Sequence, residues 1–246
     1  MDRNKFEQFQ KLVDNSKNIV FFGGAGVSTA SGIPDFRSEN GLYGEESKRK
    51  HKYSPEYMLS HTFYKDNTEE FFEFYKTEMC ALGYKPNDTH YKLAELEKVD
   101  KLKAVITQNI DGLHQLAGSK NVIELHGTIH KNTCTECGEQ YTAEYVKNSI
   151  GIPRCEKCGG IIKPDVTLYE EMLPYGVLTK ARRLIRQADL VIVAGTSLNV
   201  QPAAGLISEL NGAKLVIINK TETHQDYIAD LLIKDDMTEV FSELKA

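Results

Sequence analysis

The hydrophobic pattern of the chain alternates between short, fully apolar runs and longer stretches with helical spacing. Residues 19–22 (Ile-Val-Phe-Phe) form the first apolar run, and glycines follow at once. A run of this length without polar alternation is typical of a strand that is buried on both faces of a sheet. The same pattern of strand followed by polar turn recurs at residues 102–106, 190–194 and 214–218, with 121–125 as a shorter fifth candidate.

Stretches with helical spacing lie around these runs. Apolar side chains recur on one helix face between Phe6 and Val13, which predicts an amphipathic helix that opens the chain and ends by Asn18. Residues 90–99 and 177–187 are predicted to be helices between later strands. Strands that alternate with helices in this way indicate an α/β fold with a parallel sheet and helices on both of its faces.

Two segments interrupt the alternation. Residues 43–84 are charged and aromatic, with helices expected at 54–60 and 68–82, and residues 130–163 carry the paired cysteines. We interpret the two segments as inserts that pack together into a smaller module. The expected division assigns residues 1–42, 88–129 and 164–246 to a large domain, and residues 43–87 and 130–163 to a small one.

Composition and charge narrow the class of protein. With 246 residues, 41% hydrophobic and 26% charged, the chain has a globular balance that excludes a disordered or fibrous protein. The net charge of −5 excludes a globally basic surface for nucleic acid, and the basic run at 48–52 is interpreted as a solvated loop. No apolar run reaches the roughly 18 residues that span a bilayer, and the charged N-terminus has no signal-peptide core. We expect a cytoplasmic protein without membrane or nucleic-acid partners.

Four of the five cysteines form two pairs with metal-ligand spacing. Cys134 and Cys137 make the first CxxC, and Cys155 and Cys158 make the second after 17 intervening residues. Glycine after each pair permits the tight turn of a zinc knuckle, and four thiolates give tetrahedral zinc a closed shell. We therefore predict one structural Zn²⁺ per chain, with no open position for chemistry. Cys80 is expected to be a buried hydrophobic residue on a helix face.

A glycine-rich loop follows the first predicted strand. Glycines such as Gly24 and Gly26 let backbone N–H groups approach a pyrophosphate, and the N-terminus of the helix expected next favours negative charge. Thr29 stands in place of the third glycine of GxGxxG, so a simple tight turn is the alternative. Downstream, Arg37 is suited to clamp a phosphate and Phe36 to pack on a flat ring, with a proline turn and a surface arginine as the alternative.

Polar residues follow the strand predicted at 102–106, at the edge of the sheet where ligands bind in open α/β folds. Uncharged Gln108 and Asn109 suit hydrogen bonds to ribose hydroxyls, and the carboxylate of Asp111 suits an amide N–H. A capped turn between strand and helix is the alternative interpretation of this segment.

His126 follows the candidate strand 121–125 and stands beside a glycine. An imidazole titrates near neutral pH, so His126 is a candidate general base at a strand end. The small residues of the loop 195–202 follow another strand and suit a ribose or an adenine, and Asn219 ends the last core strand, where it can bond a ribose hydroxyl. Each of these later signals is weak when it is taken alone.

Together these segments resemble the sirtuin family of NAD-dependent protein deacylases, in particular its bacterial members. The matched stretches are GAGVS (24–28), SGIPDFR (31–37), TQNIDGL (107–113), HG (126–127), the four paired cysteines, KPDVTLYEE (163–171), GTSLNVQP (195–202) and IN (218–219). They occur in family order over almost the whole length. The resemblance implies a Rossmann-like NAD-binding domain, a smaller zinc-ribbon and helical domain, and a substrate cleft between the two.

The resemblance also implies a role for each matched residue. The diphosphate side of NAD would be held by Gly24, Ala25, Gly26, Ser28, Thr29 and Arg37. The nicotinamide and its ribose would be contacted by Phe36, Gln108, Asn109, Ile110 and Asp111, and the adenosine end by Gly195, Thr196, Ser197 and Asn219. The catalytic set would be His126 as the base with Asn109 and Asp111. The substrate would be contacted by Phe36, Thr167, Leu168 and Tyr169.

The implied activity is deacylation of protein lysines with consumption of NAD, which yields free lysine, nicotinamide and O-acetyl-ADP-ribose. In the implied mechanism, the amide oxygen of an acyl-lysine attacks the ribose carbon that bears nicotinamide. His126 then deprotonates a ribose hydroxyl, which attacks the alkylimidate. Protein mono-ADP-ribosylation on the same scaffold and a non-catalytic NAD and zinc-ribbon adaptor are the alternatives.

The chain departs from the family pattern in the substrate segment and in the helical insert. Lys163, Thr167 and Glu170 stand where Arg, Val and Gly are usual, which bears on rate and substrate range. Family members that remove acidic acyl groups carry an arginine at the position that matches Glu78. A carboxylate at this position repels a succinyl group, so we expect a preference for acetyl or longer apolar acyl groups.

Overall fold

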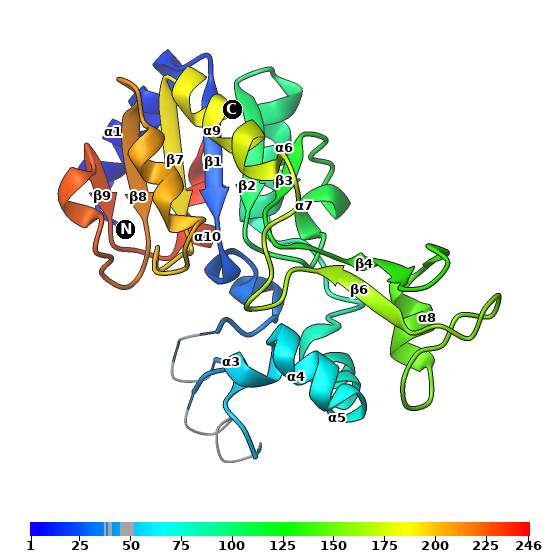
Figure 1. Cartoon of the computed structure of the whole chain (residues 1–246). Helices are drawn as coiled ribbons and strands as arrows, with labels where there is room; N and C mark the ends of the chain where they lie inside the picture. The colour runs from blue at the N-terminus through cyan, green and yellow to red at the C-terminus, as the bar shows by residue number, and fades with distance from the viewer. Residues whose placement is uncertain (37, 39–40, 45–51) are drawn as a thin grey trace.

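A parallel β-sheet forms the centre of the structure (Figure 1). The computed structural model describes residues 1–36, 38, 41–44 and 52–246, so Arg37 and residues 48–51 of the basic run lie outside the described residues. Within that part of the chain, the strand order is β3-β2-β1-β7-β8-β9. The strands are β1 (Ile19–Gly23), β2 (Leu102–Thr107), β3 (Val122–Glu124), β7 (Leu190–Ala194), β8 (Lys214–Ile218) and β9 (Leu231–Ile233). All five predicted strands belong to this sheet, and the predicted α/β class is confirmed.

β1 shows why these runs are apolar throughout. Every residue of the strand is buried, because its side chains alternate between two covered faces. Ile19 and Phe21 point into one hydrophobic cluster, whereas Val20 and Phe22 point into the other. A polar side chain at any of these positions would lose its contact with water on either face.

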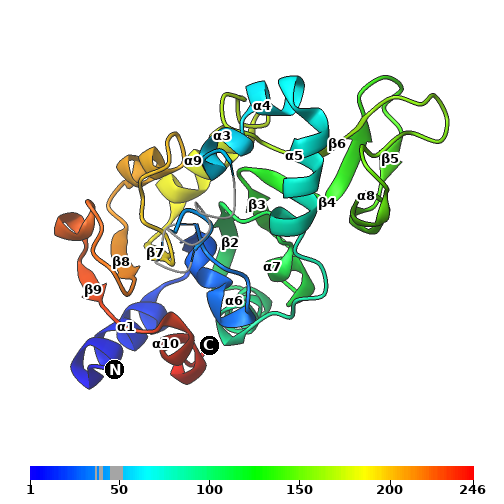
Figure 2. The same cartoon turned by 90° about the horizontal axis from the view of Figure 1, so that it is seen from below.

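Helices cover both faces, as the alternation predicts (Figure 2). One face is covered by α1 (Arg3–Asn15), α6 (Asp88–Lys98) and α10 (Met237–Glu243). The other is covered by α9 (Val177–Gln187) and the 3₁₀ turn Ala204–Glu209. The short helix α7 (Leu113–Leu116) follows β2, and a 3₁₀ turn at Asp226–Ile228 precedes β9. No helix in the described ranges is long and apolar enough to cross a membrane.

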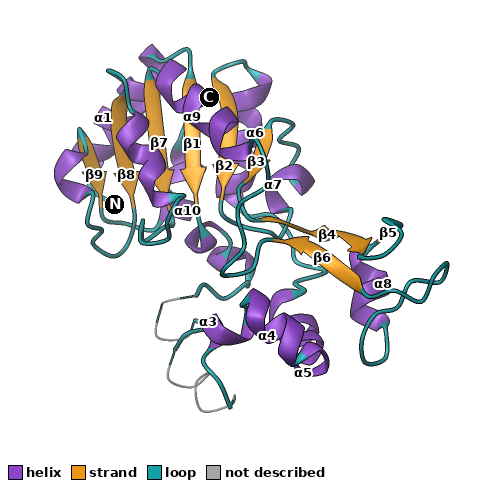
Figure 3. Cartoon of the chain, in the orientation of Figure 1, coloured by secondary structure: helices purple, strands orange, loops and turns teal. Residues whose placement is uncertain are grey.

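A smaller module lies beyond the ends of the parallel strands (Figure 3). In the described chain it contains the antiparallel sheet β5-β4-β6 and four helices. These elements are β4 (Gly127–Cys134), β5 (Gln140–Tyr141), β6 (Ile162–Val166), α3 (Pro55–Met58), α4 (His61–Asp66), α5 (Thr68–Phe74) and α8 (Ala143–Asn148). A third hydrophobic cluster joins Phe63 and Phe72 of the helical insert to Ile129 and Ile162 of the sheet. The two inserts share one core, while the exact domain boundaries stay a prediction.

Two helix predictions in the insert were wrong in extent. The first expected helix is limited to Pro55–Met58, because the Ser60 hydroxyl accepts a hydrogen bond from Phe63 N and caps the next helix, α4. The second ends at Phe74 and continues as a wider turn, in which Cys80 N donates to Tyr75 O at 2.9 Å. Cys80 is buried as predicted, and burial raises the pKa of its thiol.

The helix expected after the glycine-rich loop is absent from the described residues of that segment. Two short 3₁₀ turns replace it, Ala25–Val27 and Thr29–Ser31, and Gly32 ends the second with a φ of 92°. β9 and α10 were not predicted, because they are too short to show a clear period. Both find their partners across the chain, since β9 pairs with β8 and α10 packs on α6.

α10 contributes an aromatic anchor to the first cluster, and its loss is expected to be costly. Phe241 is 0% exposed, and its ring centroid lies 6.1 Å from that of Phe9 and 6.0 Å from that of Phe21. We expect Phe241→Ala to lower the free energy of unfolding by about 3–5 kcal/mol, because it removes buried area and leaves a cavity. Urea titration measures the change. Tyr227→Ala, at a position that is 83% exposed, is the control, and an equal loss in both variants would contradict the assignment.

Candidate active site

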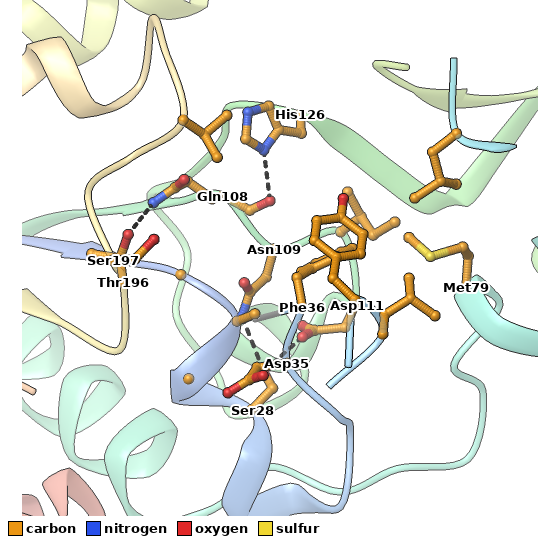
Figure 4. A pocket seen from close by; sticks show the side chains of 18 of the residues that line it. Ser28, Asp35, Phe36, Met79, Gln108, Asn109, Asp111, His126, Thr196 and Ser197 are labelled. Carbon is orange, nitrogen blue, oxygen red and sulfur yellow. Dashed lines mark hydrogen bonds between the residues drawn. The ribbon is translucent and has the colours of Figure 1, made fainter. Parts of the chain in front are cut away.

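A cavity of about 440 Å³ lies where the parallel strands end (Figure 4). Its lining includes the residues that directly follow β1, β2, β7 and β8, together with His126 and the segment after β6. Among the described residues that were predicted to bind cofactor or substrate or to act in catalysis, all line the cavity except Thr29. The cavity therefore joins residues that are up to 197 positions apart, from Gly24 to Thr221.

The glycines of the first loop permit a close approach between two loops. Gly26 N donates to Gly195 O at 2.9 Å. A Cβ on Gly26 would lie 2.8 Å from Gly195 Cα, and one on Gly24 would lie 2.9 Å from Thr196 Cβ. The absence of side chains at these positions lets the β1 and β7 loops pack backbone to backbone on one wall of the cavity. Thr29 lies outside the lining, with its hydroxyl donating to Gly26 O at 3.0 Å.

Three polar residues form a connected network on the floor of the cavity. Ser28 Oγ donates to Asp111 Oδ2 at 2.7 Å, and Asn109 Nδ2 donates to Ser28 Oγ at 3.1 Å (Figure 4). Asp111 Oδ1 accepts from Leu113 N at 2.9 Å. Burial raises the pKa of Asp111, while the bonds from Ser28 and Leu113 act in the opposite direction. The network fixes the side chain of Asp111, which is only 9% exposed, at the cavity wall.

A second network joins the ends of β2, β7 and β8. Gln108 Nε2 donates to Thr196 Oγ1 at 2.8 Å, and the same hydroxyl oxygen accepts from Leu198 N at 3.2 Å. Asn219 Nδ2 donates to Thr221 O at 3.0 Å and lies 3.4 Å from Thr196 O. These amide and hydroxyl groups place neutral hydrogen-bonding atoms along the same wall, as the sequence predicts for a site that binds sugars.

His126 is oriented by the backbone of the β2 loop. Its Nδ1 lies 2.9 Å from Gln108 O. Because a carbonyl oxygen only accepts, Nδ1 carries the proton and the neutral ring has its lone pair on Nε2. Burial lowers the pKa of His126 below its ordinary value, although the bond to Gln108 O partly opposes this effect. The lowered pKa favours the neutral ring, which is able to accept a proton at Nε2.

The segment after β6 forms the opposite wall of the cavity. Thr167 N donates to His126 O at 2.9 Å, and Tyr169 N donates to Leu59 O at 3.0 Å. The hydroxyls of Tyr169 and Tyr43 are 2.8 Å apart, and the Tyr43 ring packs against Phe36 with centroids 5.3 Å apart. The predicted substrate residues thus lie between the base candidate and the helical insert.

Two glutamates after this segment attach it to α4, and sequence reasoning missed their contacts. Glu170 has a φ of 75°, the left-handed conformation that favours glycine, and the family resemblance implies glycine at this position. Its carboxylate accepts from Thr62 N at 2.9 Å and from Thr62 Oγ1 at 2.7 Å, at the N-terminus of α4. These bonds offset the backbone strain and explain how the chain accommodates Glu170.

Glu171 is the second attachment. It accepts from Leu168 N at 2.9 Å and pairs with His61 Nδ1 at 2.9 Å and Lys163 Nζ at 3.3 Å. Burial alone would raise the pKa of Glu171, but these partners hold it below its ordinary value. The one sequence signal that could have found these contacts is the pair of acids at the end of the matched stretch 163–171, but the partners on α4, Thr62 and His61, lie 108 and 110 residues away.

The four paired cysteines come together in the smaller module. Their Sγ atoms all lie within 4.8 Å of one another, with Cys134 and Cys158 3.4 Å apart and Cys137 and Cys155 3.5 Å apart. Such distances exceed the roughly 2.05 Å of a disulfide and approach the S···S separation of about 3.8 Å that tetrahedral zinc requires with bonds of about 2.3 Å. The donor set fits Zn²⁺, and a further contact comes from Tyr141, whose hydroxyl donates to Cys155 Sγ at 3.2 Å.

The fold and the site define a Rossmann-like α/β protein with an inserted four-cysteine module and a cleft at the strand ends. The profile of the Sir2 family matches residues 24–202, a span that includes the glycine-rich loop, His126 and all four cysteines. The chain belongs to the Sir2 family, and the resemblance noted in the sequence is confirmed.

Relatives and solved structures agree with this assignment. A curated relative from Clostridium acetobutylicum, called an NAD-dependent protein deacetylase, is 57% identical over 238 residues, with 96% of each chain covered. A relative of the same name from Staphylococcus aureus (strain Mu50) is 46% identical, with 98% of each chain covered. A solved complex of Sir2 with a p53 peptide and NAD⁺ aligns at a TM-score of 0.83 and 40% identity, over 96% of this chain and 95% of that one. A Sir2 complex with EX-527, 2′-O-acetyl-ADP-ribose and deacetylated p53 peptide aligns at a TM-score of 0.82 and 39% identity, over the same shares.

Zinc is expected to stabilise the smaller module, because metal binding by four thiolates contributes directly to its folding. We expect about one zinc per chain in the native protein, and loss of ordered structure in residues 127–166 after chelation, while the parallel sheet persists. Elemental analysis and amide hydrogen exchange measure the two effects.

Cys155→Ser and Cys80→Ser form a matched pair for this test. The first removes a ligand and should lose the metal, whereas the second changes a buried cysteine outside the cluster and should keep it. A folded, active chain with far less than one zinc would contradict the assignment.

Proposed function

We propose that this chain is an NAD-dependent protein lysine deacetylase, which consumes NAD and yields deacylated lysine, nicotinamide and O-acetyl-ADP-ribose. The observation that carries the proposal is the oriented imidazole of His126, with Nδ1 bound to Gln108 O at 2.9 Å, in a cavity lined by the strand-end loops and the segment 167–169. Relatives from Clostridium and Staphylococcus bear the name of this activity, which favours it over ADP-ribosyl transfer and over binding without catalysis.

We assign NAD to the wall formed by the loops after β1, β2, β7 and β8. The diphosphate is assigned to the loop Gly24–Gly26 with Ser28, and the adenosine end to the loop that contains Thr196 and Ser197, with Asn219. Support comes from the neutral donors and acceptors of the Gln108–Thr196 network, which suit ribose hydroxyls. Thr29 stays a predicted part of the diphosphate loop, in which its hydroxyl donates to Gly26 O at 3.0 Å.

The nicotinamide side is assigned to the network on the floor of the cavity. Asp111 accepts from Ser28 and Leu113 N, and its remaining acceptor capacity suits the amide N–H of the nicotinamide. Asn109 is assigned to the ribose of that half, and Phe36 and Ile110 to the apolar wall beside the ring. These groups line one continuous surface with His126.

His126 is assigned as the general base. When bound, NAD supplies a ribose carbon whose bond to the nicotinamide ring is readily broken, because the ring is a good leaving group. Nε2 of the neutral His126 then takes the proton of a ribose hydroxyl, and the bond from Nδ1 to Gln108 O stabilises the cation that results. Leu168 and Phe36 supply apolar surface that excludes water from the acyl group.

The substrate proteins are assigned to the segment 165–169, on which an extended peptide adds as a strand. This mode of binding reads mostly backbone, so it accepts many acyl-lysine sequences. The zinc site is assigned a structural role, because four thiolates complete a tetrahedral shell. The cytoplasm stays the proposed location, since the cysteines are arranged as metal ligands.

The proposal predicts that lysine deacetylation requires NAD. With an acetyl-lysine peptide, the zinc-loaded chain should release one nicotinamide for each lysine freed and should show no turnover without NAD. His126→Ala should lower kcat by at least about 100-fold, because the proton acceptor is lost. Mass spectrometry of peptide and O-acetyl-ADP-ribose gives the measurement.

The exposed His224 provides the matched control, since His224→Ala removes an imidazole outside the cavity and should retain full activity. Deacetylation that continues without NAD would exclude the proposed reaction. Transfer of ADP-ribose to protein without loss of acetyl would establish the alternative activity.

The proposal also predicts a preference among acyl groups. Glu78 and Met79 line the cavity, so an acyl chain that ends in a carboxylate meets a second carboxylate there. We expect kcat/KM to be at least about tenfold higher for acetyl-lysine than for succinyl-lysine in the same peptide. Glu78→Gln should narrow this ratio by improving the succinyl reaction, and faster desuccinylation by the native chain would refute the preference.

A further inference from the structure

The loop that carries Asp111 is held from outside the cavity by two consecutive residues of β4. Ile129 N donates to Ile110 O at 3.0 Å, and His130 Nε2 lies 2.9 Å from Asp111 O. Because Asp111 O only accepts, His130 Nε2 is the donor. Two successive carbonyl groups of the loop are therefore bound to two successive residues of one strand.

An irregularity in β4 gives His130 this direction. β4 pairs with β6 at Gly127 and again from Asn132 onward, and the register shifts between these two points. A bulge next to a binding site redirects side chains that regular pairing would leave on the sheet surface. Within the irregular stretch, Ile129 and His130 make their bonds to the loop 110–112.

Gly112 shows how closely the imidazole covers the loop. Gly112 has a φ of 74°, and a Cβ placed on it would lie 2.6 Å from His130 Nε2 and 2.7 Å from His130 Cδ2. The ring thus occupies the space that a side chain at position 112 would need. Glycine at 112 satisfies both the left-handed backbone and the close contact with the imidazole.

The bond from His130 to Asp111 O affects the cavity because the side chain of the same residue, Asp111, lines it. The carboxylate of Asp111 is fixed by Ser28 and Leu113 N, and Ser28 in turn accepts from Asn109. A shift of the Asp111 backbone therefore moves the whole network that faces the nicotinamide side. His130 lies outside the set of described residues that line the cavity, so its influence passes through the loop.

We propose that His130 is a positioning residue that sets the nicotinamide-facing loop Ile110–Gly112 through its bond to Asp111 O. This inference rests on the proposed deacetylase function. According to this inference, His130 affects the binding and reaction of NAD but does not affect the docking of the peptide. The peptide segment is held by other bonds, from Thr167 N to His126 O and from Tyr169 N to Leu59 O.

Steady-state kinetics of the full, zinc-loaded chain test the inference. For His130→Ala we expect kcat/KM for NAD to fall by about three- to tenfold, the scale of one lost hydrogen bond at an exposed side chain. KM for the acetyl-lysine peptide should stay within about twofold, because the contacts of its docking segment are untouched. The inhibition constant of nicotinamide should rise by a factor similar to that for NAD.

Two further variants separate the donor from the packing. His130→Gln retains an N–H donor of similar reach and should recover most of the lost NAD efficiency. His130→Phe keeps a ring against Gly112 without the donor and should behave like alanine. Lys131→Ala, at the next exposed position, is the matched control and should leave both substrates unchanged. If the alanine variant does not fold, the difference in NAD efficiency between the glutamine and phenylalanine variants tests the inference.

Three outcomes would overturn the inference. The first is an equal loss of efficiency with NAD and with the peptide, and the second is no loss of NAD efficiency in the alanine and phenylalanine variants. The third is a glutamine variant whose NAD efficiency is no better than that of the phenylalanine variant. These outcomes are distinct from a failure of the proposed function. In that case the native chain itself would show no NAD-dependent deacetylation.

Discussion

The parallel direction of the central strands is the constraint on which the site depends. β1 is in register with both of its neighbours, so Gly23 lies beside Thr107 of β2 and Ala194 of β7, and Ala194 lies beside Ile218 of β8. All four strands therefore release their chains at one edge of the sheet. The strand direction alone therefore brings together loops that are far apart in sequence, and the cavity forms from the first residues of each loop.

The apolar runs and the loop motifs were readable from the sequence because their signals are local. The strand β1 is recognisable from four consecutive apolar residues, 19–22, and the cysteine pairs from their spacing. β9 and α10 were not predicted because they are short and are stabilised by contacts with elements that are distant in sequence. The helix expected after Gly26 was predicted wrongly for a related reason, since the loop is shaped by its contact with Gly195.

The contacts around the substrate segment could not have been predicted from local pattern. Glu170 departs from the usual residue of its family, and the sequence gives no reason for the change. In the structure the same carboxylate caps α4 through Thr62, so a local cost in backbone conformation is offset by a contact between two modules. The glycine-rich loop is a similar case. Its glycines let the loop at Gly195 approach closely, and they also leave room for a ligand.

The shared core of the two inserts has a mechanical consequence. The helices α3 to α5 and the sheet β4 to β6 leave the main body as separate stretches of chain and return to it, and they are joined by the cluster around Phe63 and Ile129. A lobe tethered by several connections resists twisting and sliding far more than one that hangs from a single linker. We therefore expect the motion left to it to be a rocking of one lip of the cleft against the other, which changes the width of the opening and keeps its alignment.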